Sequence, residues 1–160
     1  MSGLLLVGLA VHWAGDTADG AIARRRGEET VTGAVLDICA DRLCVCAVYL
    51  VSVVSAPQFT VPVLVYLFEF AFAHTVLSLA FLRFGLLSPN YFDRVDRRVW
   101  RWNWWLPAKA MNSALVAVLC LVFQLVWVGL AVATALPLVK SVCLVRVSHR
   151  LSHQTGGGLF

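Results

Sequence analysis

Charged residues are scarce in this chain: Asp, Glu, Lys and Arg make up 14% of its 160 residues, while hydrophobic residues make up 60%. A soluble domain is about a quarter charged and about half apolar. The excess of apolar residues lies in long runs such as 43–54, 61–82 and 111–139. Apolar runs of about 18 or more residues are typical of membrane-spanning helices. The composition therefore argues against a large soluble core and favours an all-α integral membrane protein.

The cysteines lack the spacing of a zinc site. Cys44 and Cys46 are two residues apart, which places them on different faces of a helix. All five cysteines lie in or beside apolar segments, and we interpret them as small hydrophobic residues. The sequence also contains no internal repeat.

The formal net charge of +4 does not indicate nucleic-acid binding, because most basic residues lie between the apolar runs. They form three clusters, at 24–26, 94–109 and 146–150. The positive-inside rule places such clusters on the cytoplasmic side of a membrane. Trp and Arg alternate in the middle cluster, a mixture that suits a membrane–water interface.

The apolar pattern predicts one domain over 1–151, followed by a flexible tail over 152–160. Helices are expected over 3–25, 33–55 and 62–87. The stretch 111–147 is too long for one span, because about 1.5 Å per residue exceeds a hydrocarbon core of about 30 Å. We therefore expect two spans there, with a turn between 124 and 132. The prediction is a bundle of about five transmembrane helices.

The acidic residues of the first two helices follow a helical period. Two faces result, one on each helix: Asp16, Asp19, Gly20, Ala23 and Arg24 on the first, and Gly33, Asp37 and Asp41 on the second. Spacings of three and four residues place side chains on one helix face. Two helix ends can thus direct four carboxylates to one point.

Four converging carboxylates would repel one another at a membrane surface, where unpaired charge is costly. A divalent cation removes that cost. Carboxylate oxygens suit Mg²⁺ or Mn²⁺, with Ca²⁺ as an alternative. Such a cation can bridge a diphosphate. The lack of bulk at Gly20 and Ala23 would admit a nucleotide, and Arg24 could contact its phosphates.

The segment from Asp16 to Asp41 reads D-x2-D-G-x2-A-R-x8-G-x3-D-x3-D. This pattern resembles the signature of the CDP-alcohol phosphatidyltransferase family, with every fixed position present. The resemblance implies an enzyme in which an alcohol attacks the phosphate of a CDP-linked donor, usually CDP-diacylglycerol, and releases CMP during phospholipid biosynthesis. It also implies a homodimer in the membrane, which we expect to be a bacterial plasma membrane, with the active site on the cytoplasmic side.

The resemblance carries roles to individual positions. Asp16, Asp19, Asp37 and Asp41 correspond to the metal ligands, and Asp41 also to the general base. The surface that receives the CDP moiety corresponds to Gly20, Ala23, Arg24 and Gly33. The residues that correspond to the binding site of a phosphorylated acceptor, such as inositol phosphate or glycerol phosphate, are Arg83, Arg94, Arg97, Arg98 and Lys109. For each of these five, an interpretation as an interfacial charge that reaches lipid headgroups is at least as good.

Glu69 and His74 interrupt an apolar run. An ionisable residue within a membrane is a functional candidate by default. A hydrogen-bonded Glu69 at a helix contact is an equally good interpretation, and His74 is better interpreted as a satisfied core residue.

The family typically has six membrane helices, with the signature at the end of the second. Only 15 residues precede Asp16, about 22 Å of helix. We therefore expect that the first helix is missing from this chain. The missing helix motivates one alternative function, that of a truncated, non-catalytic membrane relative. A second alternative, based on the paired carboxylates, is an aspartate-rich enzyme of the prenyltransferase kind.

Overall fold

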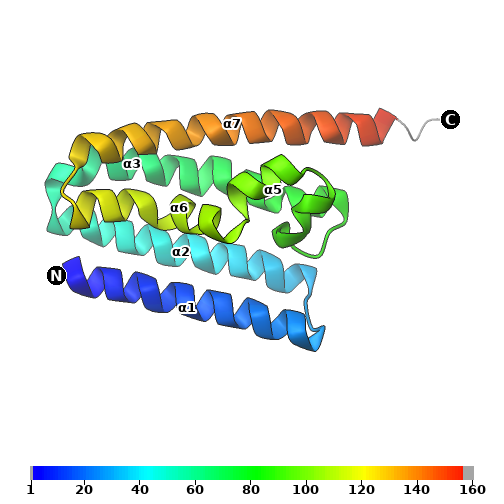
Figure 1. The fold of residues 1–160 in the computed structure, drawn as a ribbon, viewed down its shortest axis with the longest axis horizontal. Helices are drawn as coiled ribbons and strands as arrows, with labels where there is room; N and C mark the ends of the chain where they lie inside the picture. Colours follow the sequence, from blue (N-terminus) through cyan, green and yellow to red (C-terminus); the bar gives the residue numbers. More distant parts are fainter. Residues whose placement is uncertain (1, 157–160) are drawn as a thin grey trace.

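The computed structural model describes residues 2–156, which are almost entirely helical and contain no strand. The long helices lie side by side (Figure 1). α1 (Ser2–Arg26) and α2 (Val31–Ser55) form an antiparallel hairpin along one side of the bundle, and α7 (Val126–Gly156) runs along the opposite side. α3 (Thr60–Phe68) and α6 (Leu106–Ala117) lie between them.

Shorter elements complete the middle of the chain. They are η1 (Pro57–Phe59), the π-helical turn η2 (Glu69–His74), α4 (Thr75–Leu79), η3 (Ala80–Phe84), η4 (Pro89–Arg94), α5 (Arg97–Asn103) and the π-helical turn η5 (Val118–Val122). The elements from η1 to η3 follow one another as a single helical stretch, which ends at Gly85 with a φ of 63°. Only glycine adopts that conformation at no steric cost.

Three helical stretches of the described residues are long and apolar enough to cross a membrane: Val31–Ser55, Pro57–Phe84 and Val126–His153. α5 with Leu106–Val122, bent by 42°, makes a fourth if the pair is one span. These findings confirm the all-α membrane class. α1 forms as a helix, but it is not among these stretches, so the expected count of about five spans holds only if α1 is included.

The predicted ends of the first two helices agree with the structure within two residues. The turn expected between 124 and 132 lies slightly earlier, because α7 already begins at Val126. Gln124 adopts a positive φ of 55° in the break before it. α7 also extends to Gly156, so the first part of the expected tail is helical; the rest of that tail lies outside the described residues.

Two tyrosine hydroxyls attach α6 to the first half of the bundle. Tyr49 donates to the carbonyl of Ser113 at 3.0 Å and accepts from the amide of Ala117 at 3.0 Å. Tyr66 donates to the carbonyl of Asn112 at 2.9 Å. The two rings stack 4.4 Å apart and are fully buried, so their polar ends need these partners. The contacts fix the face of α6 that borders the site described below.

The break between η5 and α7 brings two helical segments close together. A Cβ built on Gly129 would lie 2.5 Å from Sγ of Cys120, which is completely buried. We expect Gly129→Ala to lower the free energy of unfolding by about 1–3 kcal/mol, because overpacking a closed core forces its neighbours to shift. Thermal unfolding of the purified protein in detergent measures the change.

Gly8→Ala is the matched control, since nothing lies within 4 Å of a Cβ built at that position. Alanine is a better helix former than glycine, so this variant should be unchanged or more stable by about 0.5–1 kcal/mol. Equal melting temperatures for both variants would mean that the Gly129 contact is not tight in the folded protein.

The basic clusters gather at one end of the bundle. The α1–α2 loop, the segment from η4 to α5 and the C-terminal part of α7 all lie there (Figure 1). This arrangement agrees with the expectation that the clusters share one side. Lys140 lies outside the three clusters. Its side chain is completely buried, and its Nζ donates to Oδ1 of Asn103.

Candidate functional site

The site lies where the α1–α2 hairpin closes. α1 ends in Arg24, Arg25 and Arg26, and cations at this position interact favourably with the helix dipole. The chain turns at Gly27, with a φ of 65°, and α2 begins after Thr30. The Thr30 hydroxyl accepts from the amide of Gly33 at 3.0 Å and so caps the helix. The hairpin therefore holds the two acidic helix faces against each other.

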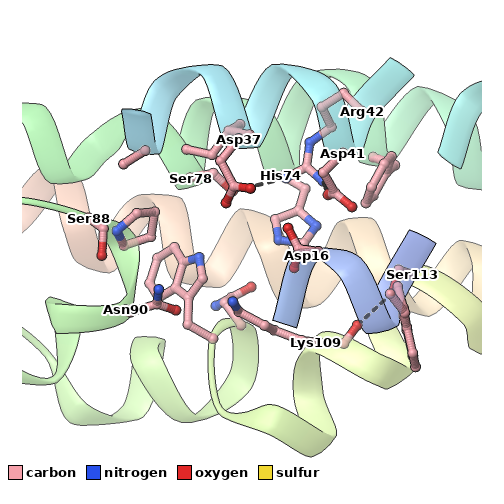
Figure 2. A pocket seen from close by; sticks show the side chains of 17 residues that line it. Asp16, Asp37, Asp41, Arg42, His74, Ser78, Ser88, Asn90, Lys109 and Ser113 are labelled. Carbon is pink, nitrogen blue, oxygen red and sulfur yellow. Dashed lines mark hydrogen bonds and ion pairs between the residues drawn. The ribbon is translucent and has the colours of Figure 1, made fainter. Parts of the chain in front are cut away.

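Three cavities adjoin at this hairpin. We call them the inner cavity (about 100 Å³), the hairpin cavity (about 210 Å³) and the lateral cavity (about 260 Å³). Asp37 lines all three, and Asp16 lines the inner and lateral cavities. Asp41 lines the inner cavity and Asp19 the hairpin cavity. The four carboxylates thus border a group of adjoining cavities, of which Figure 2 shows the inner one.

The side chains of Asp16 and Asp37 are within hydrogen-bonding distance of each other. Two carboxylates at that separation share either a proton or a cation. Among residues 2–156, no three His, Cys, Asp or Glu side chains are gathered closely enough to hold an ion as they stand. The donor set nevertheless fits a hard cation, since it consists of carboxylate oxygens centred on this pair and flanked by Asp19 and Asp41.

Asp41 is held in place by two cationic or polar groups that the sequence interpretation did not assign to the site. Nη1 of Arg42 lies 2.7 Å from Oδ2 of Asp41, and Nε2 of His12 lies 3.3 Å from Oδ1. His12 precedes Asp16 by four residues and shares its helix face, so the period could have identified it. These contacts fix the orientation of the Asp41 carboxylate toward the inner cavity.

Arg42 uses its whole guanidinium in the interior. Besides the pair with Asp41, its Nε donates to Thr75 at 3.1 Å and its Nη2 to Ser78 at 3.0 Å. The planar group also stacks 3.9 Å above the ring of Phe70. Such a fork of donors is specific to arginine. Arg42 therefore links α2 to α4 through these hydrogen bonds and to η2 through Phe70.

The residues expected to receive the CDP moiety lie together. Gly20, Ala23, Arg24 and Gly33 all line the hairpin cavity. A Cβ built on Gly20 would lie 3.1 Å from Nη1 of Arg24. The guanidinium of Arg24 can occupy its position because Gly20 has no side chain. A Cβ on Gly33 would lie 2.9 Å from the Thr30 hydroxyl, which would disturb the cap of α2.

The residues expected to bind a phosphorylated acceptor do not lie together. Lys109 is half-buried and lines the inner and lateral cavities. The other four are exposed and line none of the three cavities: Arg83, Arg94, Arg97 and Arg98. One of these four, Arg94, stacks on another residue of η4 instead: its guanidinium lies 4.7 Å above the ring of Tyr91.

Tyr91 connects η4 to the α1–α2 loop. Its hydroxyl donates to Glu29, and this hydrogen bond raises the pKa of Tyr91. Glu29 lines the hairpin cavity, so the contact ties the wall of that cavity to the interfacial segment. The sequence offered no signal for this pair, which is separated by 62 positions.

The polar interior beside the inner cavity consists of four residues: Glu69, His74, Asn103 and Lys140. All four are buried, and His74 and Asn103 line the cavity itself. The amide of Asn103 accepts from Lys140 and donates to the carbonyl of Val99 at 2.7 Å. Lys140 thus orients Asn103, a role that the position of Lys140 in an apolar run did not suggest.

Comparison with known proteins gives one match. A family model described as CDP-alcohol phosphatidyltransferase matches residues 2–140. No curated protein and no solved structure matches this chain.

Proposed function

Because the chain belongs to the CDP-alcohol phosphatidyltransferase family, we propose that it transfers a phosphatidyl group from a CDP-linked lipid to an alcohol in a metal-dependent reaction that releases CMP. One observation carries this proposal. Asp19 and Asp37, from the acidic faces of α1 and α2, line the same cavity as Gly20, Ala23, Arg24 and Gly33, and the other two cavities adjoin it at Asp37. A diphosphate bound along the hairpin would therefore lie beside the carboxylates.

The reaction forms one bond and breaks one. The acceptor oxygen bonds to the lipid-side phosphorus of the donor, the link between the two phosphates breaks, and CMP leaves. Asp41 accepts the proton of the acceptor hydroxyl, while Arg42 and His12 hold its carboxylate in place. Arg24 contacts the donor phosphates. Asp16, Asp19, Asp37 and Asp41 would hold the divalent cation, which would neutralise charge on the diphosphate and on departing CMP.

The membrane setting supports a lipid donor. The site lies at the basic end of helices that are long enough to cross a bilayer, so an acyl-chain donor could reach it from the membrane. The positive-inside rule places that end in the cytoplasm. CDP-diacylglycerol, phospholipid biosynthesis and a bacterial plasma membrane are the corresponding parts of the proposal.

The test is an assay of the purified protein in detergent with radiolabelled CDP-diacylglycerol, Mg²⁺ and a panel of alcohols. We expect CMP release that depends on both acceptor and metal. A parallel assay with prenyl diphosphate distinguishes the prenyltransferase alternative. Donor binding without turnover for any acceptor would instead favour the non-catalytic relative and contradict the proposal.

Arg24→Ala is expected to raise the KM for CDP-diacylglycerol by roughly 10–100-fold, because a hydrogen bond to a charged group is worth about 1.5–3 kcal/mol. The acceptor KM should change much less. Steady-state assays that vary each substrate separately measure both values.

Arg25→Ala provides the control. Arg25 is exposed, is adjacent in sequence and lines none of the three cavities. Equal effects of the two variants on the donor KM would show that Arg24 acts only through the general charge of the helix end.

A further inference from the structure

Two residues lie where all three cavities adjoin. Among the described residues, only Asp37 and Asn90 line the inner, the hairpin and the lateral cavity. Asp37 lies on α2 and belongs to the acidic sequence pattern, whereas Asn90 lies in η4, outside that pattern. Figure 2 shows both side chains at the inner cavity. Asn90 therefore shares the central position of Asp37, although the proposed reaction gives it no role.

The proposed reaction has to occur close to this junction. The donor diphosphate would lie along the hairpin cavity, beside Arg24 and Gly33, while the proposed base Asp41 lines the inner cavity. Reaction requires the acceptor oxygen to approach the transferred phosphate to about 3–3.5 Å. A phosphate that reacts with an oxygen next to Asp41 must therefore lie near the residues that border both cavities.

Few side chains at this boundary can donate a hydrogen bond to a phosphate. The residues that line both the inner and the hairpin cavity are Ala34, Asp37, Ser88 and Asn90. Ala34 is apolar, an ionised Asp37 only accepts, and the hydroxyl of Ser88 is buried. Asn90 is half-buried, and its amide carries two N–H donors. Of these four, Asn90 is therefore the one suited to donate to a bound phosphate.

The backbone of Asn90 is held in place independently of its side chain. Its carbonyl accepts a hydrogen bond from Nε1 of Trp100 at 2.8 Å, and the preceding Pro89 is buried. The next residue, Tyr91, donates from its hydroxyl to Glu29 in the α1–α2 loop. The side-chain amide of Asn90 makes no hydrogen bond within residues 2–156. An anchored backbone thus presents an uncommitted donor to the junction.

We propose that the amide of Asn90 donates a hydrogen bond to a non-bridging oxygen of the lipid-side phosphate, the group that is transferred. This inference rests on the proposed transferase function and adds a residue to it. Negative charge in the transition state is spread over the equatorial oxygens of that phosphate. A donor that is already in position stabilises this charge without having to reorganise during the reaction, and asparagine amides are among the groups that do so.

The first experiment compares Asn90→Ala with the parent protein in the CMP-release assay. We expect kcat to fall by about 100-fold, the usual effect of removing one preorganised donor, and the donor KM to change by less than about threefold. The melting temperature should stay the same, because the substitution leaves the Asn90 carbonyl and its hydrogen bond to Trp100 intact.

The inference and the proposed function can fail separately. Parent-like turnover of Asn90→Ala would overturn the inference and leave the transferase function intact. A loss of activity that came with a lower melting temperature and with equal changes in the donor and acceptor KM would point to a structural role and would also overturn it. Absence of CMP release from the parent protein with every acceptor would count against the proposed function itself.

Asn90→Asp tests whether the N–H donors of the amide matter. The carboxylate has nearly the same shape, but when ionised it only accepts hydrogen bonds, and it adds negative charge beside the diphosphate. We expect the loss of kcat to be at least as large as in Asn90→Ala. Gln58→Glu is the matched control, since Gln58 is exposed on η1 and lines none of the three cavities. An equal loss in Gln58→Glu would mean that added charge, and not contact with the phosphate, lowers the rate.

The amide of Asn90 could instead coordinate the cation, because amide carbonyl oxygens bind hard cations. Titration of Mg²⁺ against activity separates the two roles. For a phosphate contact, the Mg²⁺ concentration for half-maximal activity of Asn90→Ala stays within about threefold of the parent value, and the loss of kcat persists at saturating metal. A requirement raised by about tenfold or more, with kcat restored at saturating Mg²⁺, would assign Asn90 to the cation and overturn the inference.

Discussion

Asp41→Asn is expected to lower CMP release by about two to four orders of magnitude, the usual contribution of a general base. The amide has nearly the same shape as the carboxylate, but it cannot take the proton of the acceptor hydroxyl. Binding of CDP-diacylglycerol should be affected much less, since Asp41 lines the inner cavity and not the hairpin cavity. Turnover and donor binding are measured on the same preparation.

Two controls separate chemistry from folding. Asp93→Asn removes an exposed carboxylate on η4 that lines none of the cavities, and it should be silent. The melting temperature of Asp41→Asn must also be compared with that of the parent protein, because the substitution removes the ion pair with Arg42. Full activity of Asp41→Asn would exclude Asp41 as the base.

Removal of divalent metal is expected to reduce CMP release to background, with recovery on addition of Mg²⁺ or Mn²⁺. Without a cation, the carboxylates around the donor diphosphate would repel it, and the departing CMP would lack charge neutralisation. Dialysis against a chelator followed by metal titration measures the effect. Persistent activity after exhaustive chelation would remove the cation from the proposed reaction.

Asp37→Asn tests whether Asp37 is one of the side chains that bind the metal. Asp37 lines all three cavities and lies within hydrogen-bonding distance of Asp16, so it should be the most sensitive ligand. We expect the concentration of Mg²⁺ needed for half-maximal activity to rise by at least about tenfold, a loss of about 1.4 kcal/mol. An unchanged metal requirement would place the cation elsewhere.

The sequence predicted the hairpin well because two independent signals, the apolar runs and the spacing of the acidic residues, agree there. Apolar runs determined α1 and α2, and the spacing from Asp16 to Asp41 placed the acidic faces at the same end. Both signals are local, and both follow from the geometry of one helix. The assignment of metal and base roles to these carboxylates remains a prediction, which the experiments above test.

Contacts between distant segments could not be predicted in the same way. The environment of Lys140 depends on Asn103, 37 positions away, and that of Arg42 depends on Thr75 and Ser78. From the sequence alone, a basic residue in an apolar run could lie at the membrane–water interface or in a buried polar network. The packing of distant segments decides which of the two it occupies. The same limitation applied to Arg94, Arg97 and Arg98, which share a basic segment with Lys109 but do not line the cavities.

The π-helical turn η2 illustrates a subtler limit. The wider turn of a π-helix changes which side chains of Glu69–His74 face the interior, and no residue type in that segment predicts the change. The turn brings both Glu69 and His74 inside the bundle. A regular helical period would therefore misplace at least part of the segment.

Asp37 borders all three cavities, and this position has a thermodynamic consequence. A molecule that enters one cavity alters the electric field felt by a molecule in the next, because both experience the same carboxylate. Linkage requires such an influence to be mutual: whatever factor the nucleotide lipid imposes on alcohol affinity, the alcohol imposes on the nucleotide lipid. We therefore expect the proposed donor and acceptor to change each other's affinity.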